Sequence, residues 1–154
     1  MKVKVIVFTL AVFFAGVVVC SAQNAHMGTW KLNEAKSHFS KGASKNHTVA
    51  YEMSGDMIKV TVDGTDADGN ALHNEWTGKF DGKYYAITGS PTGDMRSYRQ
   101  INSRTLAFRE KKGSKIVVTG TIAVATDGKT RTVTTNSTDA KGRRMHNVAV
   151  FDKQ

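Results

Sequence analysis

Residues 68–85 read DGNALHNEWTGKFDGKYY, and this stretch predicts the fold. Two Asp-Gly pairs, at 68–69 and 81–82, enclose a segment in which Leu72, Trp76 and Phe80 fall on one face of an extended chain. Asp-Gly next to such a segment indicates a tight β-hairpin turn, because both residues accept a positive φ angle. Side chains that repeat with period two predict a strand that buries one face.

The same pattern continues in both directions, with a Gly-containing turn signal every 8–15 residues. No helical period of 3.6 residues is sustained after residue 22. We predict strands at 28–32, 47–53, 57–63, 71–80, 83–89, 95–101, 104–111, 114–126, 129–138 and 143–152. The expected fold is all-β, an antiparallel up-and-down barrel of about 8–10 strands with no full helical lid, and a two-sheet sandwich is the alternative. The nearly unbroken series of hairpins favours the barrel, whose closure removes exposed edges.

Residues 1–22 differ from the rest of the chain. A basic start precedes an apolar run over residues 5–19, and small residues follow it. This arrangement predicts a secretory signal peptide, cleaved after Ala22 or, as the alternative, after Ala25. The apolar run is short for a membrane-spanning helix, so a retained anchor is the less favoured interpretation.

The predicted cleavage leaves a single domain, residues 23–154, in a secreted or periplasmic protein with no membrane span. A lipoprotein anchor through Cys20 is less favoured, because Val19 stands where the lipidation motif has Gly, Ala or Ser.

Removal of residues 1–22 takes away two lysines and the cysteine, leaving 20 basic and 13 acidic residues, a formal charge of +7. The mature chain therefore has neither thiol catalysis nor disulfides. Its cations are spread over strands and loops, without the clustered cations and stacking aromatics of nucleic-acid-binding proteins, so we expect no nucleic-acid partner. Solubility, or attraction to anionic cell-envelope material, fits a charge distributed in this way.

No motif nominates a catalytic or metal centre, and we expect no cofactor. The acidic turn at 63–70 resembles a calcium loop. Counted from Asp63, however, the twelfth position is Asn74, where that loop has Glu, so a solvated hairpin is favoured. The five histidines lack the spacing of a local metal clamp. Nucleophile-elbow, P-loop and dinucleotide fingerprints do not occur. Asn46 and Asn136 begin sequons, which matter only in a eukaryotic secretory pathway.

The opening Gly28-Thr29-Trp30-Lys31-Leu32 resembles the first strand of the calycins, which comprise lipocalins, fatty-acid-binding proteins and avidin-like barrels. The ending Val148-Ala149-Val150-Phe151-Asp152-Lys153 is similar to the last strand of the fatty-acid-binding branch. The resemblance implies a ligand-carrying barrel whose closed end is plugged by Trp30.

That branch differs from this chain at two points. It inserts two helices after its first strand, whereas residues 33–46 have room for one short helical turn near residues 33–38. Its last strand carries an Arg that meets the ligand carboxylate, and Ala149 occupies that place here, so the carboxylate site does not carry over. Many calycins also stack a late Arg on the Trp, and Arg143 and Arg144 are the candidates for that role.

Aromatic and basic residues gather on the middle strands, which are neighbours in a meander. Arg96 and Tyr98 lie two residues apart and share a face. Together they would hold an anionic group while aromatic rings contact the apolar part of a ligand. The predicted ligand-binding residues are Trp76, Tyr85, Arg96, Tyr98 and Phe108. The alternative is that these rings fill the core and Arg96 lies at the rim.

Three hypotheses follow for function. The first is an exported barrel that binds a small hydrophobic or amphipathic ligand without catalysis. The second is a structural or interaction domain with a filled core, which uses its basic surface on anionic cell-envelope material or on a protein. The third is a barrel enzyme, which requires a buried acid or His with a hydrogen-bonding partner and which the sequence disfavours.

Overall fold

The computed structural model describes residues 25–139 and 141–154. The predicted signal peptide and Cys20 lie outside the described residues, as does the cleavage position after Ala22. Ten strands and one short 3₁₀ helix are described: β1 (Gly28–Leu32), η1 (Glu34–Lys36), β2 (Lys45–Ser54), β3 (Met57–Thr65), β4 (Ala71–Gly78), β5 (Tyr85–Thr88), β6 (Met95–Asn102), β7 (Thr105–Lys112), β8 (Lys115–Val124), β9 (Thr130–Thr138) and β10 (Arg144–Lys153). Within this part of the chain, no helix is long and apolar enough to cross a bilayer.

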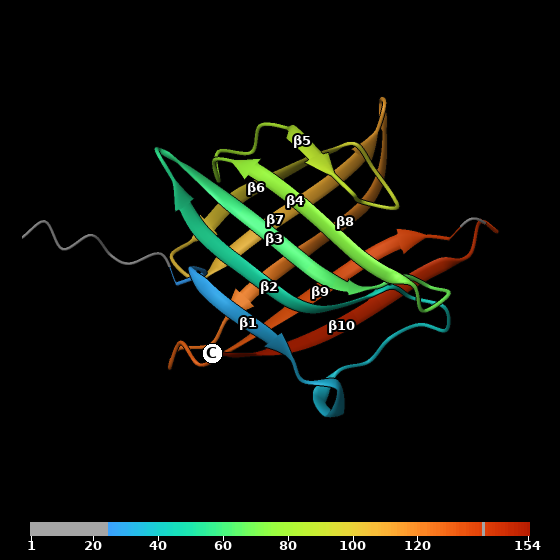
Figure 1. The fold of residues 1–154 in the computed structure, drawn as a ribbon, viewed down its shortest axis with the longest axis horizontal. Helices are drawn as coiled ribbons and strands as arrows, with labels where there is room; N and C mark the ends of the chain where they lie inside the picture. Colours follow the sequence, from blue (N-terminus) through green and yellow to red (C-terminus); the bar gives the residue numbers. More distant parts are fainter. Residues whose placement is uncertain (1–24, 140) are drawn as a thin grey trace, which may run out of the picture.

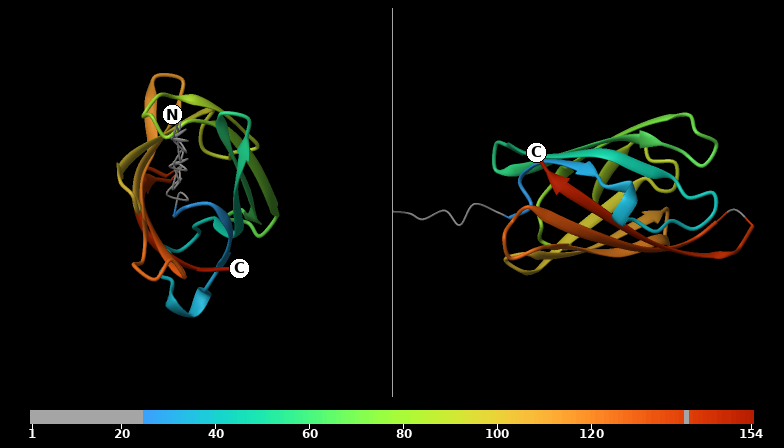
Figure 2. Two further views of the ribbon diagram at one scale, coloured as in Figure 1. Left: turned by 90° about the vertical axis from the view of Figure 1, so that its left-hand side faces the viewer. Right: turned by 90° about the horizontal axis from the view of Figure 1, so that it is seen from below.

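Each strand pairs antiparallel with the next along the chain, and β10 pairs with β1 to close the barrel (Figure 1). The predicted all-β up-and-down barrel is confirmed, and the sandwich alternative is wrong. All ten strands begin and end within two residues of their predicted positions. A view along the barrel shows the strands surrounding a common interior (Figure 2).

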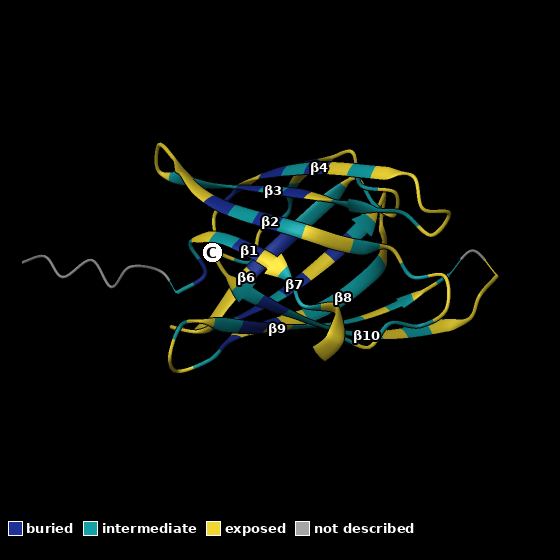
Figure 3. Ribbon diagram, turned by 60° about the horizontal axis from the view of Figure 1, so that its bottom comes forward, coloured by how far each residue is buried: buried dark blue, intermediate teal, exposed yellow. Residues whose placement is uncertain are grey.

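The interior is built by alternate residues of each strand. Val49, Val62 and Asn74 lie side by side in register on β2, β3 and β4, and all three are buried. Buried positions alternate with exposed ones along the strands, and the turns are exposed (Figure 3). The buried apolar core consists of Trp30, Val49, Tyr51, Val60, Val62, Trp76, Ile87, Tyr98, Leu106, Phe108, Ile122, Val124 and Phe151.

The Asp-Gly turns form with a different backbone from the one predicted. Only glycines have positive φ among the described residues, for example 82° at Gly82, so the preceding Asp stays in an ordinary conformation. In the turn at 81–82 the Asp carboxylate instead accepts the backbone N–H two residues on, with Asp81 Oδ1 2.9 Å from the Lys83 nitrogen. In the turn at 68–69 the acceptor is Asp66, whose Oδ1 lies 2.9 Å from the Asp68 nitrogen. These turns are therefore held by Asx-type hydrogen bonds.

The connection from β1 to β2 holds the predicted short helical turn, η1, and then follows β10 toward the open end of the barrel. His38 and Val148 exchange backbone hydrogen bonds of 2.7 and 2.8 Å. The Ser40 nitrogen donates to Asn147 Oδ1 at 2.7 Å. The last part of this connection lines the interior at the open end.

Residues 25–27 cover the opposite end of the barrel. His26 is buried, and its ring packs edge-on against Phe80 with centroids 6.2 Å apart. Its carbonyl oxygen accepts a hydrogen bond of 2.8 Å from Trp30 Nε1. Trp30 is itself completely buried, at the place that the calycin resemblance implies for it.

Candidate functional site

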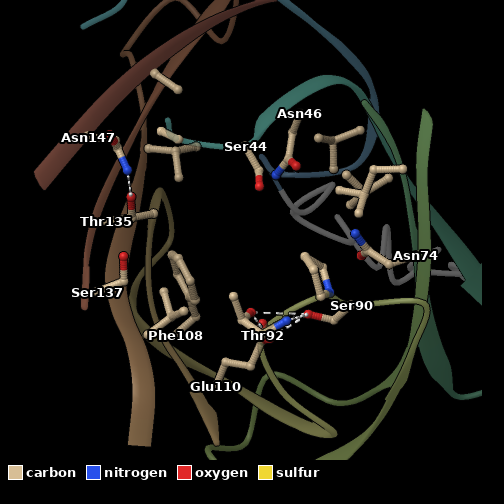
Figure 4. Close-up of a pocket in the computed structure, with 18 of the residues that line it drawn as sticks. Ser44, Asn46, Asn74, Ser90, Thr92, Phe108, Glu110, Thr135, Ser137 and Asn147 are labelled. Carbon is tan, nitrogen blue, oxygen red and sulfur yellow. Dashed lines mark hydrogen bonds between the residues drawn. The ribbon is translucent and has the colours of Figure 1, made fainter. Parts of the chain in front are cut away.

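A cavity of about 340 Å³ lies inside the barrel (Figure 4). Side chains from most of the strands line it, together with residues 39–44 and the β5–β6 loop at the open end. This volume is that of a small-molecule pocket. The barrel interior therefore contains space that side chains do not occupy. The hypothesis of a filled core requires the opposite.

The lining changes character with depth. The apolar walls include Val49, Val62, Ile122 and Val133. Toward the open end the lining is made of amide and hydroxyl groups, which project into the cavity in Figure 4: Ser44, Asn46, Thr92, Thr135, Ser137 and Asn147. Asn74 adds one amide group beside Val62 on the apolar wall. A ligand in this cavity would meet apolar groups in its lower part and hydrogen-bonding groups near the mouth.

An ion pair between Arg96 and Glu110 forms one side of the cavity. Arg96 Nε lies 3.0 Å from Glu110 Oε2, and Arg96 Nη2 contacts the same oxygen. Ser90 and Thr92 each donate a hydroxyl hydrogen bond of 2.5 Å to Glu110 Oε1. Burial alone would raise the pKa of Glu110, but Arg96 and the two hydroxyl groups outweigh it and hold that pKa below its usual value.

Glu110 was not among the predicted site residues, although the signal for it is present in the sequence. It follows Leu106 and Phe108 at spacing two, so the alternation of β7 places it on the inner face. Glu110 is only 1% exposed. Its partners Ser90 and Thr92 come from a loop about twenty residues earlier, and local pattern does not reveal that contact.

A second buried arginine, Arg131, lies at the floor of the cavity. Its guanidinium is 4.8 Å from the Trp30 ring centroid, 5.0 Å from Tyr51 and 4.9 Å from Phe151. Its Nε and Nη1 atoms have no hydrogen-bond partner among the described residues, and no carboxylate there pairs with it. Burial lowers the pKa of Arg131, and its interaction with Tyr51 opposes that effect.

Arg131 also corrects the expectation that Arg143 or Arg144 stacks on Trp30. Arg143 is exposed in the β9–β10 turn, where its Nε lies 2.7 Å from Asp139 Oδ2. Arg144 is exposed at the start of β10. The stacking residue comes instead from β9, because Arg131 faces Phe151 across the β9–β10 pair, next to the strand that carries Trp30.

The structure brings three of the five predicted ligand-binding residues to the cavity: Arg96, Tyr98 and Phe108. Trp76 and Tyr85 are not among its lining residues. Trp76 packs edge-on against Tyr98, with ring centroids 4.7 Å apart, and donates from Nε1 to the Arg96 carbonyl at 2.9 Å. The Tyr85 hydroxyl donates to Asp81 Oδ2 at 2.9 Å. These two residues therefore support the cavity wall, and contact between them and a ligand stays a prediction.

No family model matches the sequence, and no curated protein matches it. Among solved structures, the chain is similar to a redesigned β-barrel, mFAP1, bound to DFHBI, with 12% identity and a TM-score of 0.47 over 84% of this chain and 95% of that one. It is also similar to EF1p2_mFAP2b bound to DFHBI, with 11% identity and a TM-score of 0.47 over 84% of this chain and 94% of that one.

Proposed function

We propose that this protein binds a small, partly apolar ligand inside the barrel and does not transform it. The observation that carries the proposal is the cavity of about 340 Å³, which has apolar walls and a hydrogen-bonding mouth. Pockets of this size enclose small organic ligands, and a few polar groups orient them. The stacking of Arg131 on Trp30 further supports a distant relationship to the calycins.

The cation that is available to a ligand is Arg131, whereas the sequence predicts Arg96. Arg96 was expected to anchor an anionic group, but Glu110 already compensates its charge. Arg131 has no such carboxylate partner among the described residues, and it lines the cavity floor. An uncompensated cation in a region of low dielectric favours an anionic or strongly hydrogen-bond-accepting ligand. We therefore expect the cavity to prefer amphipathic anions to neutral molecules of the same shape.

The state of Glu110 supports binding without catalysis. Glu110 is a buried acid with partners, which the enzyme hypothesis required. However, its pKa is lowered, so the carboxylate is ionised at neutral pH and has no proton to donate. Hydrogen bonds from Arg96, Ser90 and Thr92 occupy both of its oxygens, so it is also a weak base.

A cavity-filling substitution tests the proposal. Ala149 lines the cavity on β10, and Ala149→Phe would fill part of the volume. Ala123→Phe is the matched control, because Ala123 is exposed on β8. We expect isothermal titration with 1-anilinonaphthalene-8-sulfonate to show one saturable site. Ala149→Phe should weaken it at least about tenfold, and Ala123→Phe should leave it unchanged. Equal affinity in both variants, or no saturable binding to the wild type, would contradict the proposal.

The outer surface supports a second candidate, adhesion to anionic cell-envelope material. Arg99 and Arg109 are exposed on the neighbouring strands β6 and β7, and neither forms an ion pair with another described residue. Retention on an anionic polymer such as heparin should then fall steeply as salt rises from 50 to 500 mM, and more weakly for Arg99→Gln/Arg109→Gln. Retention that does not depend on salt would contradict this candidate.

A further inference from the structure

The barrel wall opens between β8 and β9 near the open end. Pairing between these strands starts at Val118 and Ser137 and runs toward the closed end. Among the described residues, Lys115 and Ile116 pair only with β7, and Thr138 pairs only with β10. The two hairpins that contain these segments point apart in Figure 1, with the end of β9 and β10 extending beyond β8.

A β-bulge in β8 gives the physical reason for this divergence. Glu110 of β7 pairs with Val118, but the next residue, Lys111, pairs with Ile116. Val117 is thus an extra residue in β8. A bulge bends its strand and interrupts pairing, so the first residues of β8 turn away from β9. The same bend leaves Ile116 exposed over 46% of its surface.

A pocket occupies this opening and is lined by residues from both faces of the barrel wall. Val118, Ser137 and Met145 are inward-facing residues that also line the cavity. Thr119, Asn136 and His146 are their neighbours along the strands and point outward. We call the opening bounded by Ile116, Val117, Val118, Ser137, Thr138 and Met145 the slot.

The charge at the rim of the slot is positive. Arg144 is exposed there and forms no ion pair with another described residue. The adjacent Arg143 is instead paired with Asp139. A free cation at the rim and Arg131 at the cavity floor would attract an anion first to the opening and then inward.

The open end of the barrel is the competing route, and two segments that are held to the barrel wall border it. Residues 37–44 are held to β10 through His38 and Ser40. The β5–β6 loop is held to β7, because Ser90 and Thr92 both donate to Glu110 and the Asp94 nitrogen donates to the Lys111 carbonyl at 3.0 Å. These hydrogen bonds fix the edges of the open end, whereas the slot lacks strand pairing and can widen without breaking any.

We propose that the slot between β8 and β9 is the entrance to the cavity, and that Arg144 draws amphipathic anions to it. The inference rests on the proposed function. The apolar edge formed by Ile116, Val117 and Met145 contacts the apolar part of the ligand during passage, and Arg144 contacts its anionic group.

Closing the slot tests the route. Val117→Cys and Thr138→Cys, in a chain that also carries Cys20→Ser, would be joined by ethanediyl bismethanethiosulfonate, a cross-linker that reduction removes. Stopped-flow mixing with 1-anilinonaphthalene-8-sulfonate should show association and dissociation rates both at least about tenfold slower, with the Kd within about twofold. Reduction should restore both rates.

The control cross-link joins Thr105→Cys to Ala123→Cys, a pair already in register on β7 and β8. It should change neither rate. Unchanged rates with the slot closed would overturn the inference while leaving the cavity proposal intact. Absence of saturable binding to the wild type would overturn the proposed function and this inference together.

The role of Arg144 is tested with two probes of the same skeleton. Arg144→Glu should slow association of the anionic 1-anilinonaphthalene-8-sulfonate at least about fivefold at low salt, and hardly affect neutral N-phenyl-1-naphthylamine. Arg143→Glu is the matched control and should have a smaller effect. Equal slowing of both probes, or none, would overturn electrostatic attraction at the rim.

Discussion

At the scale of single residues, Glu110 and Arg96 depend on one another because both lie in the barrel wall away from water. Glu110→Gln would leave Arg96 buried without a compensating charge. We expect the free energy of unfolding in urea to fall by about 3 kcal/mol. Glu75→Gln is the control, since the ion pair of Glu75 with Lys59 is about 40% exposed on both sides, and it should cost less than about 1 kcal/mol. If both variants lose the same free energy of unfolding, burial of the Arg96–Glu110 pair does not determine its contribution to stability.

His26 makes stability depend on pH. Burial, and then the charges of Arg131 and Lys153, lower its pKa from 6.5 to about 4. The unfolded chain therefore binds this proton at a higher pH than the folded protein. The stabilisation is complete above about pH 6.5 and is lost as pH falls toward 4, by at most about 3 kcal/mol.

We expect Tm, followed by circular dichroism, to fall between pH 7 and pH 4.5, and His26→Phe to flatten this slope. His73→Asn replaces an exposed histidine and should keep it. A slope that is identical in the wild type and in His26→Phe would show that His26 does not titrate in this window.

The two buried charges show where sequence reasoning reaches its limit. The alternation of β7 is sufficient to place Glu110 on the inner face of the barrel, so an acid at an inward position of a strand is a signal present in the sequence. Arg131 also follows inward alternation on β9, but its stacking partners Trp30 and Tyr51 come from strands about a hundred and about eighty residues away. Whether a buried cation is compensated by a carboxylate depends on such long-range contacts, which local sequence patterns do not show.

At the scale of elements, residues 25–27 distinguish between the two predicted cleavage positions. Cleavage after Ala25 would put a charged amino group on His26, which is buried against Phe80 and supports Trp30. Such a charge is costly to bury. We therefore propose that a chain cleaved by a signal peptidase begins at Gln23, as intact-mass measurement of the cleaved chain would show. A mature chain that begins at His26 would contradict this prediction.

Strand positions were predictable because turn residues bracket each alternating segment. Most of these turns contain glycine, and the β6–β7 turn instead has Asn102 and Ser103. The bulge at Val117 could not be predicted from the sequence. A bulge is an extra residue in one strand relative to its partner, so it is defined only by the pairing of the two strands. The slot depends on that bulge, so it could not be predicted from the sequence either. The cavity also depends on how large inward side chains such as Phe108 and Met145 are arranged, and period two gives their direction but not the space between them.

At the scale of the whole molecule, the first and last described strands, β1 and β10, meet at the seam of the barrel. The Gln154 nitrogen donates to the Thr29 carbonyl at 3.0 Å, and Trp30 pairs with Lys153. A circular permutant that joins Gln154 to Ala25 through about six Gly/Ser residues, with new ends between Asn102 and Ser103 in the exposed β6–β7 turn, should fold. We expect its Tm to lie within about 10 °C of the original.

New ends between Phe108 and Arg109 would interrupt β7 beside the Arg96–Glu110 pair, and that permutant should not fold. If the permutant with new ends in the β6–β7 turn does not fold and the one with new ends within β7 does, the result would contradict this strand topology.

The burial of both tryptophans has an optical consequence. Trp30 and Trp76 are the chain's two tryptophans, and each is at most 1% exposed. Their emission therefore comes wholly from the barrel interior and should be blue-shifted, with no contribution from surface indoles. Because Trp76 packs directly on Tyr98 of the cavity wall, excitation energy absorbed by Trp76 should pass to a naphthalene ring bound beside it. The protein thus carries its own donor fluorophores, and occupancy of the cavity can be read without any label.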